Sequence, residues 1–481
     1  MSTRMPCLVL TLLLPVADIG ADSLVIDSRR QWEQWQFPQG VIDLHEDGSV
    51  GLIRFDRNID AVADARNFTH KNAAGDEVRG GISKAGSNPA DAANILDADP
   101  ETWWQPDPAA DVDSWRIEID LGRLVQASTI RLHFPDNDEA VPLREFTVLA
   151  SEGTRQAIGR DLFLFSRVGG TTLPNEETLI EIQLSTVEPG NATGDHLVTT
   201  TDDTLSHMPV QYVRIVSQTK NPGGALADVE VIALGDNIGL GTIERGGTLR
   251  GGSNTQNITN LADGSASLWW SGRGRPIPWR ESGMWFEWDL GATFWVDRLA
   301  MLEPSYAYAT TGSQNSQQIS FEWQTSDGTP VPTEGDVTIQ SPFDFQYLTF
   351  IDNRETSGAG RNRHYDLRFP PRKVRYLFYN HEAFDQFFTY HLFEVFLYGR
   401  GFPAKVRARS GLIDLQGAKS LRSIRWEAMT PPGTGIEIRS RTGDSIVEEI
   451  LYFGKNGEAI SEALWNKLPA SQKLPLVVNP E

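Results

Sequence analysis

Residues 79–104 read RGGISKAGSNPADAANILDADPETWW, and residues 245–270 read RGGTLRGGSNTQNITNLADGSASLWW. Aligned without a gap, ten of the twenty-six positions are identical, including the opening Arg-Gly-Gly and the closing Trp-Trp. Two further blocks follow in the same order in each half: EIDLG and LADV in the first, EWDLG and LFEV in the second. Three blocks in one order, at nearly equal spacing, indicate one domain that is present twice.

The composition sets broad limits on the class of protein. A chain of 481 residues suits about three domains. Its 40% hydrophobic residues, with 14 Trp and 22 Phe, are sufficient for folded cores. The formal net charge of −21 argues against a nucleic-acid partner and against bulk electrostatic adhesion to anionic lipid.

The first 21 residues have the pattern of a secretory signal peptide. Arg4 supplies the positive charge, an apolar run follows, and Ala21 is a small residue at a plausible cleavage position. No segment is apolar for long enough to span a bilayer as a helix. Cys7 is the only cysteine and lies inside this segment, so we expect an exported mature chain without disulfides. Extracellular, cell-surface and periplasmic locations all agree with this pattern.

The rest of the chain favours an all-β fold. Short β-branched runs separated by Gly, Pro, Asn and Asp turns are typical of an antiparallel sandwich. Predicted strands include 115–121, 129–134, 146–150, 179–184 and 212–216, then 285–290, 298–302, 319–325 and 374–379. The expected organisation is a signal peptide (1–21), N-terminal strands packed on the first sandwich (22–78), sandwich one (79–235), a linker (236–241), sandwich two (242–400) and a smaller β-rich unit, complete or truncated (401–481).

The repeat resembles the discoidin family, which includes the coagulation factor C-type domains and family 32 carbohydrate-binding modules. The resemblance depends on NILDADPETWW at 94–104, WRIEIDLG at 115–122 and LADVEV at 226–231. It implies two tandem jelly-roll-like sandwiches, over about two thirds of the chain, and a function in carbohydrate binding.

The acidic loop of the first copy is a candidate calcium site. Asp97, Asp99 and Thr102 offer side-chain oxygens within six residues, and Ca²⁺ takes six to eight oxygen ligands. The family resemblance adds the carbonyl of Asn94 and the carboxylate of Asp228. The alternative is an Asp-rich turn that hydrogen-bonds only its own backbone.

The second copy is a poorer calcium candidate. Asp263 is kept and Glu394 supplies the distal carboxylate, but Ser265 replaces the second aspartate and Leu268 replaces the threonine. In both copies we expect the second tryptophan of the Trp-Trp pair to be buried in the core. Alternation along a strand would turn the first one toward a surface or a neighbouring domain.

The loops of the second copy carry the residue types of a sugar-binding site. Sugars are bound by an aromatic face together with planar polar groups. Candidates on three predicted loops are Arg273, Arg275, Trp279, Arg280, Tyr306, Tyr308, Arg363 and His364. The alternative is that these aromatics pack the loops or an interdomain contact. In the first copy, His133 and the acidic residues at 136–139 offer polar groups without an obvious exposed ring.

No local motif of a catalytic site is present: no GxSxG, no HExxH and no phosphate-binding loop. We therefore interpret the chain as a secreted, non-catalytic protein that binds glycan or cell-surface polysaccharide. Two alternatives stay open. The chain could be a structural or adhesive protein that binds protein partners or itself, or it could be the non-catalytic part of a larger carbohydrate-active enzyme.

Overall fold

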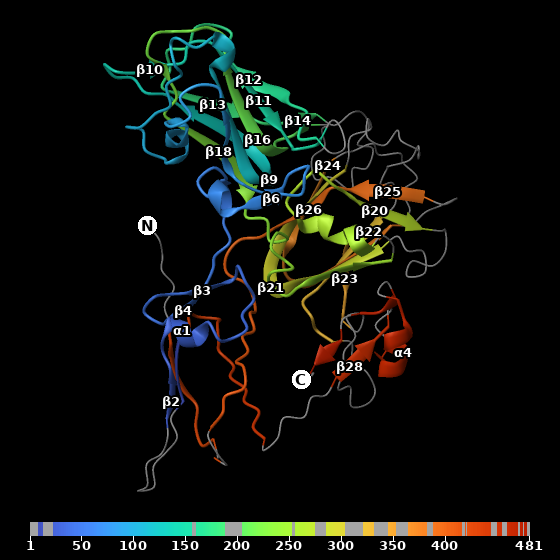
Figure 1. Ribbon diagram of the computed structural model, residues 1–481. Helices are drawn as coiled ribbons and strands as arrows, with labels where there is room; N and C mark the ends of the chain where they lie inside the picture. The colour runs from blue at the N-terminus through green and yellow to red at the C-terminus, as the bar shows by residue number, and fades with distance from the viewer. Residues whose placement is uncertain are drawn as a thin grey trace.

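The computed structural model confirms an all-β chain (Figure 1). It describes residues 8–12, 23–155, 160–187, 204–252, 255–274, 285–303, 321–330, 345–352, 364–381, 388–415, 419, 421–443, 450–454, 459–469, 472–474 and 476–478. Within these residues, no helix is long and apolar enough to cross a membrane.

The first unit is an eight-stranded sheet in the order β12-β11-β16-β9-β18-β5, with β8 and β13 also paired to β9. Its strands are β5 (Arg57–Asp60), β8 (Gly81–Ala85), β9 (Arg116–His133), β11 (Phe146–Ser151), β12 (Ser166–Gly170), β13 (Leu179–Gln183), β16 (Met208–Ser217) and β18 (Asp228–Gly235). Short 3-10 helices η1 (Ala65–Asn67), η2 (Ala92–Leu96) and η3 (Val112–Ser114) lie between them in the chain.

The second unit repeats this pairing pattern. Its sheet runs β19-β21-β24-β22-β23, with β26 also on β21. The long strand β21 corresponds to β9, β22 to β11, β26 to β18, and β24 to β13 and β16 joined into one strand. The bounds are β19 (Thr248–Gly251), β21 (Trp285–Leu302), β22 (Phe321–Ser326), β23 (Leu348–Asp352), β24 (His364–His381) and β26 (Glu394–Tyr398), with the 3-10 helix η4 (Thr255–Ala262).

Each long strand is interrupted near its middle by a glycine with a left-handed backbone. Gly122 has φ 70° and Gly291 has φ 79°. At each glycine the register of the antiparallel pairing shifts. Four residues of β9 lie opposite one residue of β16, and four residues of β21 lie opposite one residue of β24. This bulge bends the strand, so its two halves enter different layers of the sandwich. Two predicted strands in each copy are therefore one bent strand.

The two sandwiches have separate apolar cores, each containing the second tryptophan of its Trp-Trp pair. Trp104 belongs to the first core and Trp270 to the second, with 1% and 0% exposure. Trp269 packs instead on a third cluster, where Leu124 of the first unit meets Phe393 and Phe396 of the second. The predicted burial of the second tryptophan is confirmed, and Trp269 does face the neighbouring domain.

The strand registers correct the gapless alignment at its beginning. Gly81 pairs with Asp120, whereas Thr248 pairs with the corresponding Asp289. The one-residue difference is absorbed by a bulge at Ser83 in β8. The two Arg-Gly-Gly sequences are therefore out of structural register by one residue.

The predicted linker at 236–241 is a packed segment of the second unit. Ile238 is buried in the second core. The buried Arg245 guanidinium donates hydrogen bonds to the carbonyl oxygens of Ile238, Leu240 and Leu290 and to the Thr242 hydroxyl. Burial lowers the pKa of Arg245 to about 10. The joint between the sandwiches is thus held by a buried arginine.

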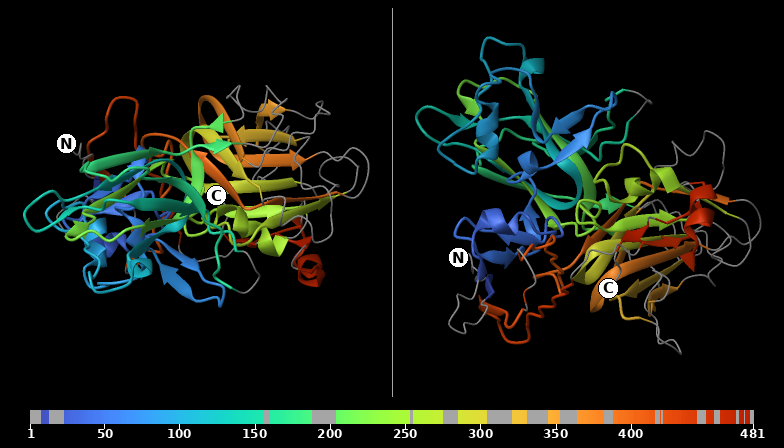
Figure 2. Two further views of the ribbon diagram at one scale, coloured as in Figure 1. Left: turned by 90° about the horizontal axis from the view of Figure 1, so that it is seen from above. Right: turned by 60° about the horizontal axis from the view of Figure 1, so that its bottom comes forward.

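Parts of the N-terminal and C-terminal segments pack together (Figures 1 and 2). The segment expected as strands on the first sandwich divides: β5 joins that sheet, while Trp32 packs near Ile424 and Ile438. Strand β1 (Leu8–Leu12) lies between β2 (Leu24–Ile26) and β27 (Arg425–Ala428). Because β1 lies within residues 1–21, cleavage of a signal peptide would remove it; that cleavage stays a prediction.

The remaining elements are short. The Asp47-Gly48 turn joins β3 to β4, and the short helix α4 near the C-terminal end is capped by Ser461. The bounds are α1 (Arg29–Trp32), β3 (Ile42–Leu44), β4 (Val50–Leu52), β6 (Thr69–Lys71), β7 (Glu77–Arg79), β10 (Val141–Pro142), β14 (Thr186–Val187), β15 (Thr204–Leu205), β17 (Gly224–Ala225), β20 (Trp270–Gly274), β25 (Phe388–Leu392), β28 (Ile450–Phe453), β29 (Ala459–Ile460), α4 (Glu462–Lys467) and β30 (Val477–Val478).

We predict that Arg245→Met destabilises the second unit by about 3 kcal/mol, because buried carbonyl groups lose their donors. The free energy of unfolding from urea titration measures this change. Arg79→Met is the matched control: Arg79 aligns with Arg245 in sequence but is exposed, and it should cost less than about 1 kcal/mol. Equal losses in the two variants would contradict the role of Arg245.

Candidate functional site

In the second copy, the acidic loop is closed by a carboxylate from the last strand. Glu394 at the start of β26 is fully buried and accepts hydrogen bonds from the Gly264 amide (3.1 Å) and from the Asn237 side chain (3.3 Å). Burial raises the pKa of Glu394 well above its ordinary value, and the charge of Asp263 raises it further. The loop is thus held by direct hydrogen bonds to protein groups.

The first copy has the same turn. The Asp97 Oδ1 atom accepts from the Asp99 amide (2.9 Å), and the Asp99 Oδ1 atom accepts from the Glu101 amide (3.0 Å). The Thr102 hydroxyl donates to Asp97 Oδ2 (2.9 Å), and the Asn94 amide group donates to the Trp103 carbonyl (3.0 Å). The structure therefore brings Asn94, Asp97, Asp99 and Thr102 into one turn.

Asp228 takes the position of Glu394 but does not close the loop. Continuing the antiparallel pair Trp104–Leu226 by two residues, back to Thr102 and forward to Asp228, sets these two residues opposite each other. Asp228 is 8% exposed, and no hydrogen bond joins its carboxylate to this loop among the described residues. Burial raises the pKa of Asp228 to about 6. This carboxylate is buried and has no hydrogen bond to the loop, so a bound cation would satisfy it better than the loop alone does.

The calcium donor set therefore fits the first copy better than the second. The first offers carboxylates from Asp97, Asp99 and Asp228 and a hydroxyl from Thr102, which are the hard oxygen ligands that Ca²⁺ prefers. In the second, Glu394 already bonds the loop amide of Gly264.

One end of the first sandwich carries loops that contact one another. The Asn221 side chain donates to the Pro142 carbonyl (3.1 Å), and Lys220 donates to the Pro108 carbonyl (3.3 Å). Asn175 donates to the Leu143 carbonyl (3.2 Å). Segments around residues 108, 142, 175 and 221 thus meet in one rim.

Most of the predicted sugar-binding residues lie outside the described residues: Arg275, Trp279, Arg280, Tyr306, Tyr308 and Arg363. The backbone of Arg273 is in β20, opposite Thr389, and that of His364 begins β24, opposite Leu302. The structure thus places the strands that lead into these loops, while the contacts of the loops themselves stay a prediction.

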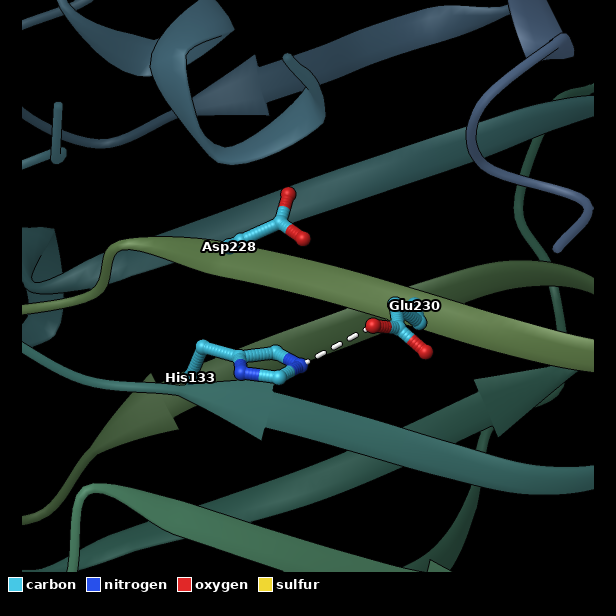
Figure 3. A group of neighbouring side chains, drawn as sticks. All are labelled: His133, Asp228 and Glu230. Atoms are coloured by element: carbon cyan, nitrogen blue, oxygen red, sulfur yellow. Dashed lines mark hydrogen bonds and ion pairs between the residues drawn. The ribbon is translucent and has the colours of Figure 1, made fainter. Parts of the chain in front are cut away.

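The structure also brings together three side chains that the sequence reading did not combine (Figure 3). His133, Asp228 and Glu230 each offer one donor atom, and these atoms lie within 4.8 Å of one another. The His133 Nε2 atom is 3.1 Å from Glu230 Oε1. The sequence indicates His133 and Asp228 as separate polar candidates, and the pairing of β9 with β18 places them side by side.

No protein-family profile and no curated protein sequence matches the chain. Among solved structures, a family 32 carbohydrate-binding module from Clostridium perfringens NanJ in complex with galactose is similar, with 11% identity and a TM-score of 0.23 over 32% of this chain and 91% of that one. A fucolectin from striped bass serum has 15% identity and a TM-score of 0.23, over 69% of this chain and 98% of that one. At these values the fold assignment rests on the strand registers of the chain itself.

We predict that Glu394→Gln raises the melting temperature above about pH 5. Because the pKa of Glu394 is raised in the folded state, its contribution to stability is full below the pKa of the unfolded state and is lost as the pH rises. Glutamine does not titrate, so the stabilisation by Glu394→Gln should grow toward neutral pH. Melting curves of wild type and variant across pH 4 to 8 measure the difference.

Glu394→Ala is the comparison variant and should lower the melting temperature, because the Gly264 amide and Asn237 lose their acceptor. The opposite result would be a melting temperature that Glu394→Gln lowers. If chelating agents then abolished the difference from wild type, a cation rather than a hydrogen bond would be using this carboxylate.

Proposed function

We propose that the chain is an exported, non-catalytic glycan-binding protein with two discoidin-like sandwiches, and that the loop rim of the second sandwich binds the sugar. The observation that carries the proposal is the meeting of four loops in the first sandwich, combined with the repeated strand registers. The bent strands β21 and β24 have the same pairing as their counterparts in the first unit.

The register supports a common rim for the second copy. Trp285 pairs with Asn380 at one end of the bent strands, and Leu302 pairs with His364 at the other. In the first sandwich the segments next to the corresponding strand ends are joined by hydrogen bonds, which supports a common rim at both strand ends of the second. The segments that carry Trp279 and Tyr306 adjoin these strand ends in the sequence.

The residue types in these segments match the chemistry of sugar recognition. An indole or phenol ring covers the apolar face of a pyranose, and Arg groups donate paired hydrogen bonds to neighbouring hydroxyls or to a carboxylate. In the first sandwich the corresponding rim is closed by hydrogen bonds among its own loops. We therefore assign sugar binding to the second copy.

We predict that the mature protein binds immobilised glycans and that Trp279→Ala reduces this binding at least tenfold without lowering the melting temperature. A glycan array followed by affinity measurement on the best glycan tests this. Trp295→Ala is the matched control: Trp295 is exposed in β21 beside the bulge, away from both ends of that strand, and this variant should bind as wild type does.

Absence of binding to every glycan, together with assembly into a defined oligomer, would contradict the proposal and favour a structural or adhesive role.

We further propose that the loop of the first copy binds calcium through the Asn94 carbonyl, Asp97, Asp99, Thr102 and Asp228. The buried Asp228 carboxylate, which faces this loop from the last strand without a hydrogen bond to it, supports this assignment. The cation would take the place that the longer Glu394 side chain fills in the second copy, and it would stabilise the turn on which the first sandwich closes.

We predict one calcium ion per chain by calorimetric titration. Calcium at 100 times its dissociation constant should add about 2.7 kcal/mol of stability. Asp99→Ala should weaken binding at least tenfold, whereas Ser265→Ala, at the aligned position of the second copy, should leave it unchanged. The site would be excluded if calcium addition produced no heat and no shift of the melting temperature.

A further inference from the structure

We propose that His133, Asp228 and Glu230 form a zinc-binding site on the outer face of the first sandwich, which shares only Asp228 with the calcium loop. The proposal goes beyond glycan binding and does not depend on it. It rests on strand register, distances and local charge, and each is considered in turn.

The strand register places the three side chains on one face of the sheet. Asp228 of β18 is the direct antiparallel partner of His133 of β9, so the two side chains project from the same face. Glu230 is two residues further along β18 and shares that face by strand alternation. The intervening Val229 is buried in the core, which makes the face of the triad the outer one.

The distances are close to those that a zinc ion needs. Bonds of about 2.0–2.2 Å in a tetrahedral arrangement put donor atoms roughly 3.3 Å apart. His133 Nε2 and Glu230 Oε1 are already 3.1 Å apart, and all three donor atoms lie within 4.8 Å of one another. Figure 3 shows the Asp228 side chain beside the other two, and its carboxylate would turn toward them to complete the set.

The local charge also favours a cation. Arg131 pairs with Glu181 (2.6 Å) and with the Oε2 atom of Glu230 (3.0 Å), which leaves Oε1 facing the imidazole. Asp60 is close enough for its charge to act on Asp228. Four carboxylates against one guanidinium leave this patch negative. In addition, Arg131 holds the Glu230 carboxylate in place, as outer-shell partners do for metal ligands.

The ligand types and exposure select zinc and leave room for a fourth ligand. An imidazole nitrogen suits zinc and other transition metals, whereas calcium takes oxygen ligands. The side chains of His133 and Glu230 are 32% and 26% exposed, so the cluster opens to solvent. Three protein ligands with an open side are the arrangement in which zinc keeps a water molecule or takes an exogenous donor.

Asp228 belongs to both proposed sites, which makes them separable by mutation. Loss of His133 should remove zinc and leave calcium, loss of Asp99 should do the reverse, and loss of Asp228 should weaken both. Zinc binding that behaved like calcium binding in these variants would mean that only one site exists.

The test is a titration of the chelator-treated full-length protein with zinc chloride, read by calorimetry and by melting temperature. We expect one equivalent of zinc and a raised melting temperature. His133→Gln should weaken zinc binding at least tenfold while calcium binding stays unchanged, and a cobalt-loaded sample should lose its visible absorption in the same variant.

His45→Gln is the control, because His45 pairs with Asp43 (3.5 Å) on an exposed hairpin without belonging to the triad. It should bind zinc as the wild type does. The proposal would be overturned if the wild type did not bind zinc. It would also be overturned if His133→Gln left zinc binding unchanged while His45→Gln reduced it.

Discussion

The architecture depends on one glycine in each long strand. At Gly122 and Gly291 the backbone takes a left-handed φ, and a Cβ atom would lie 2.7 Å from the Ala65 carbonyl oxygen and 2.9 Å from that of Arg245, respectively. Any side chain there would have to displace backbone. The bulge at the glycine lets one strand serve both layers, so each sandwich closes around an apolar core while most of its neighbours pair with a single continuous strand.

This constraint also explains which parts of the fold could be predicted from the sequence. Alternation and turn residues located the strands of both copies, because burial on one face leaves a local pattern. The sequence could not show that β9 and β21 run through their Asp-Leu-Gly turns, since a bulge is decided by what packs around the glycine. For the same reason, the bulge at Ser83 hid the true register of Arg-Gly-Gly. The buried role of Arg245 followed only from the three-dimensional contacts.

The candidate sites show the same division between local and long-range information. The ligands of the Asp97 loop are close in sequence, and the turn that holds them could be expected from Asp-rich turn chemistry. The triad of His133, Asp228 and Glu230 depends on the pairing of two strands far apart in the chain, which no local pattern specifies. Sequence reasoning identified Glu394 as a possible metal ligand. In the structure, Glu394 is buried and accepts a hydrogen bond from the Gly264 amide, so it holds the loop directly.

The contact between the two sandwiches accounts for this divergence of the copies. The Gly264 carbonyl accepts a hydrogen bond from the Leu124 amide (2.7 Å), and Ala266 lies in the apolar cluster shared by both units. Arg57 of the first unit pairs with Asp297 of the second. The loop around Asp97 is exposed in the first copy, whereas the corresponding loop of the second copy is part of the interface between the two sandwiches. A hydrated cation bound there would have to lose water on the side that faces the first unit. A glutamate long enough to bond the loop amide closes the turn through hydrogen bonds to protein groups, and the same packing fixes the two sandwiches at one relative orientation.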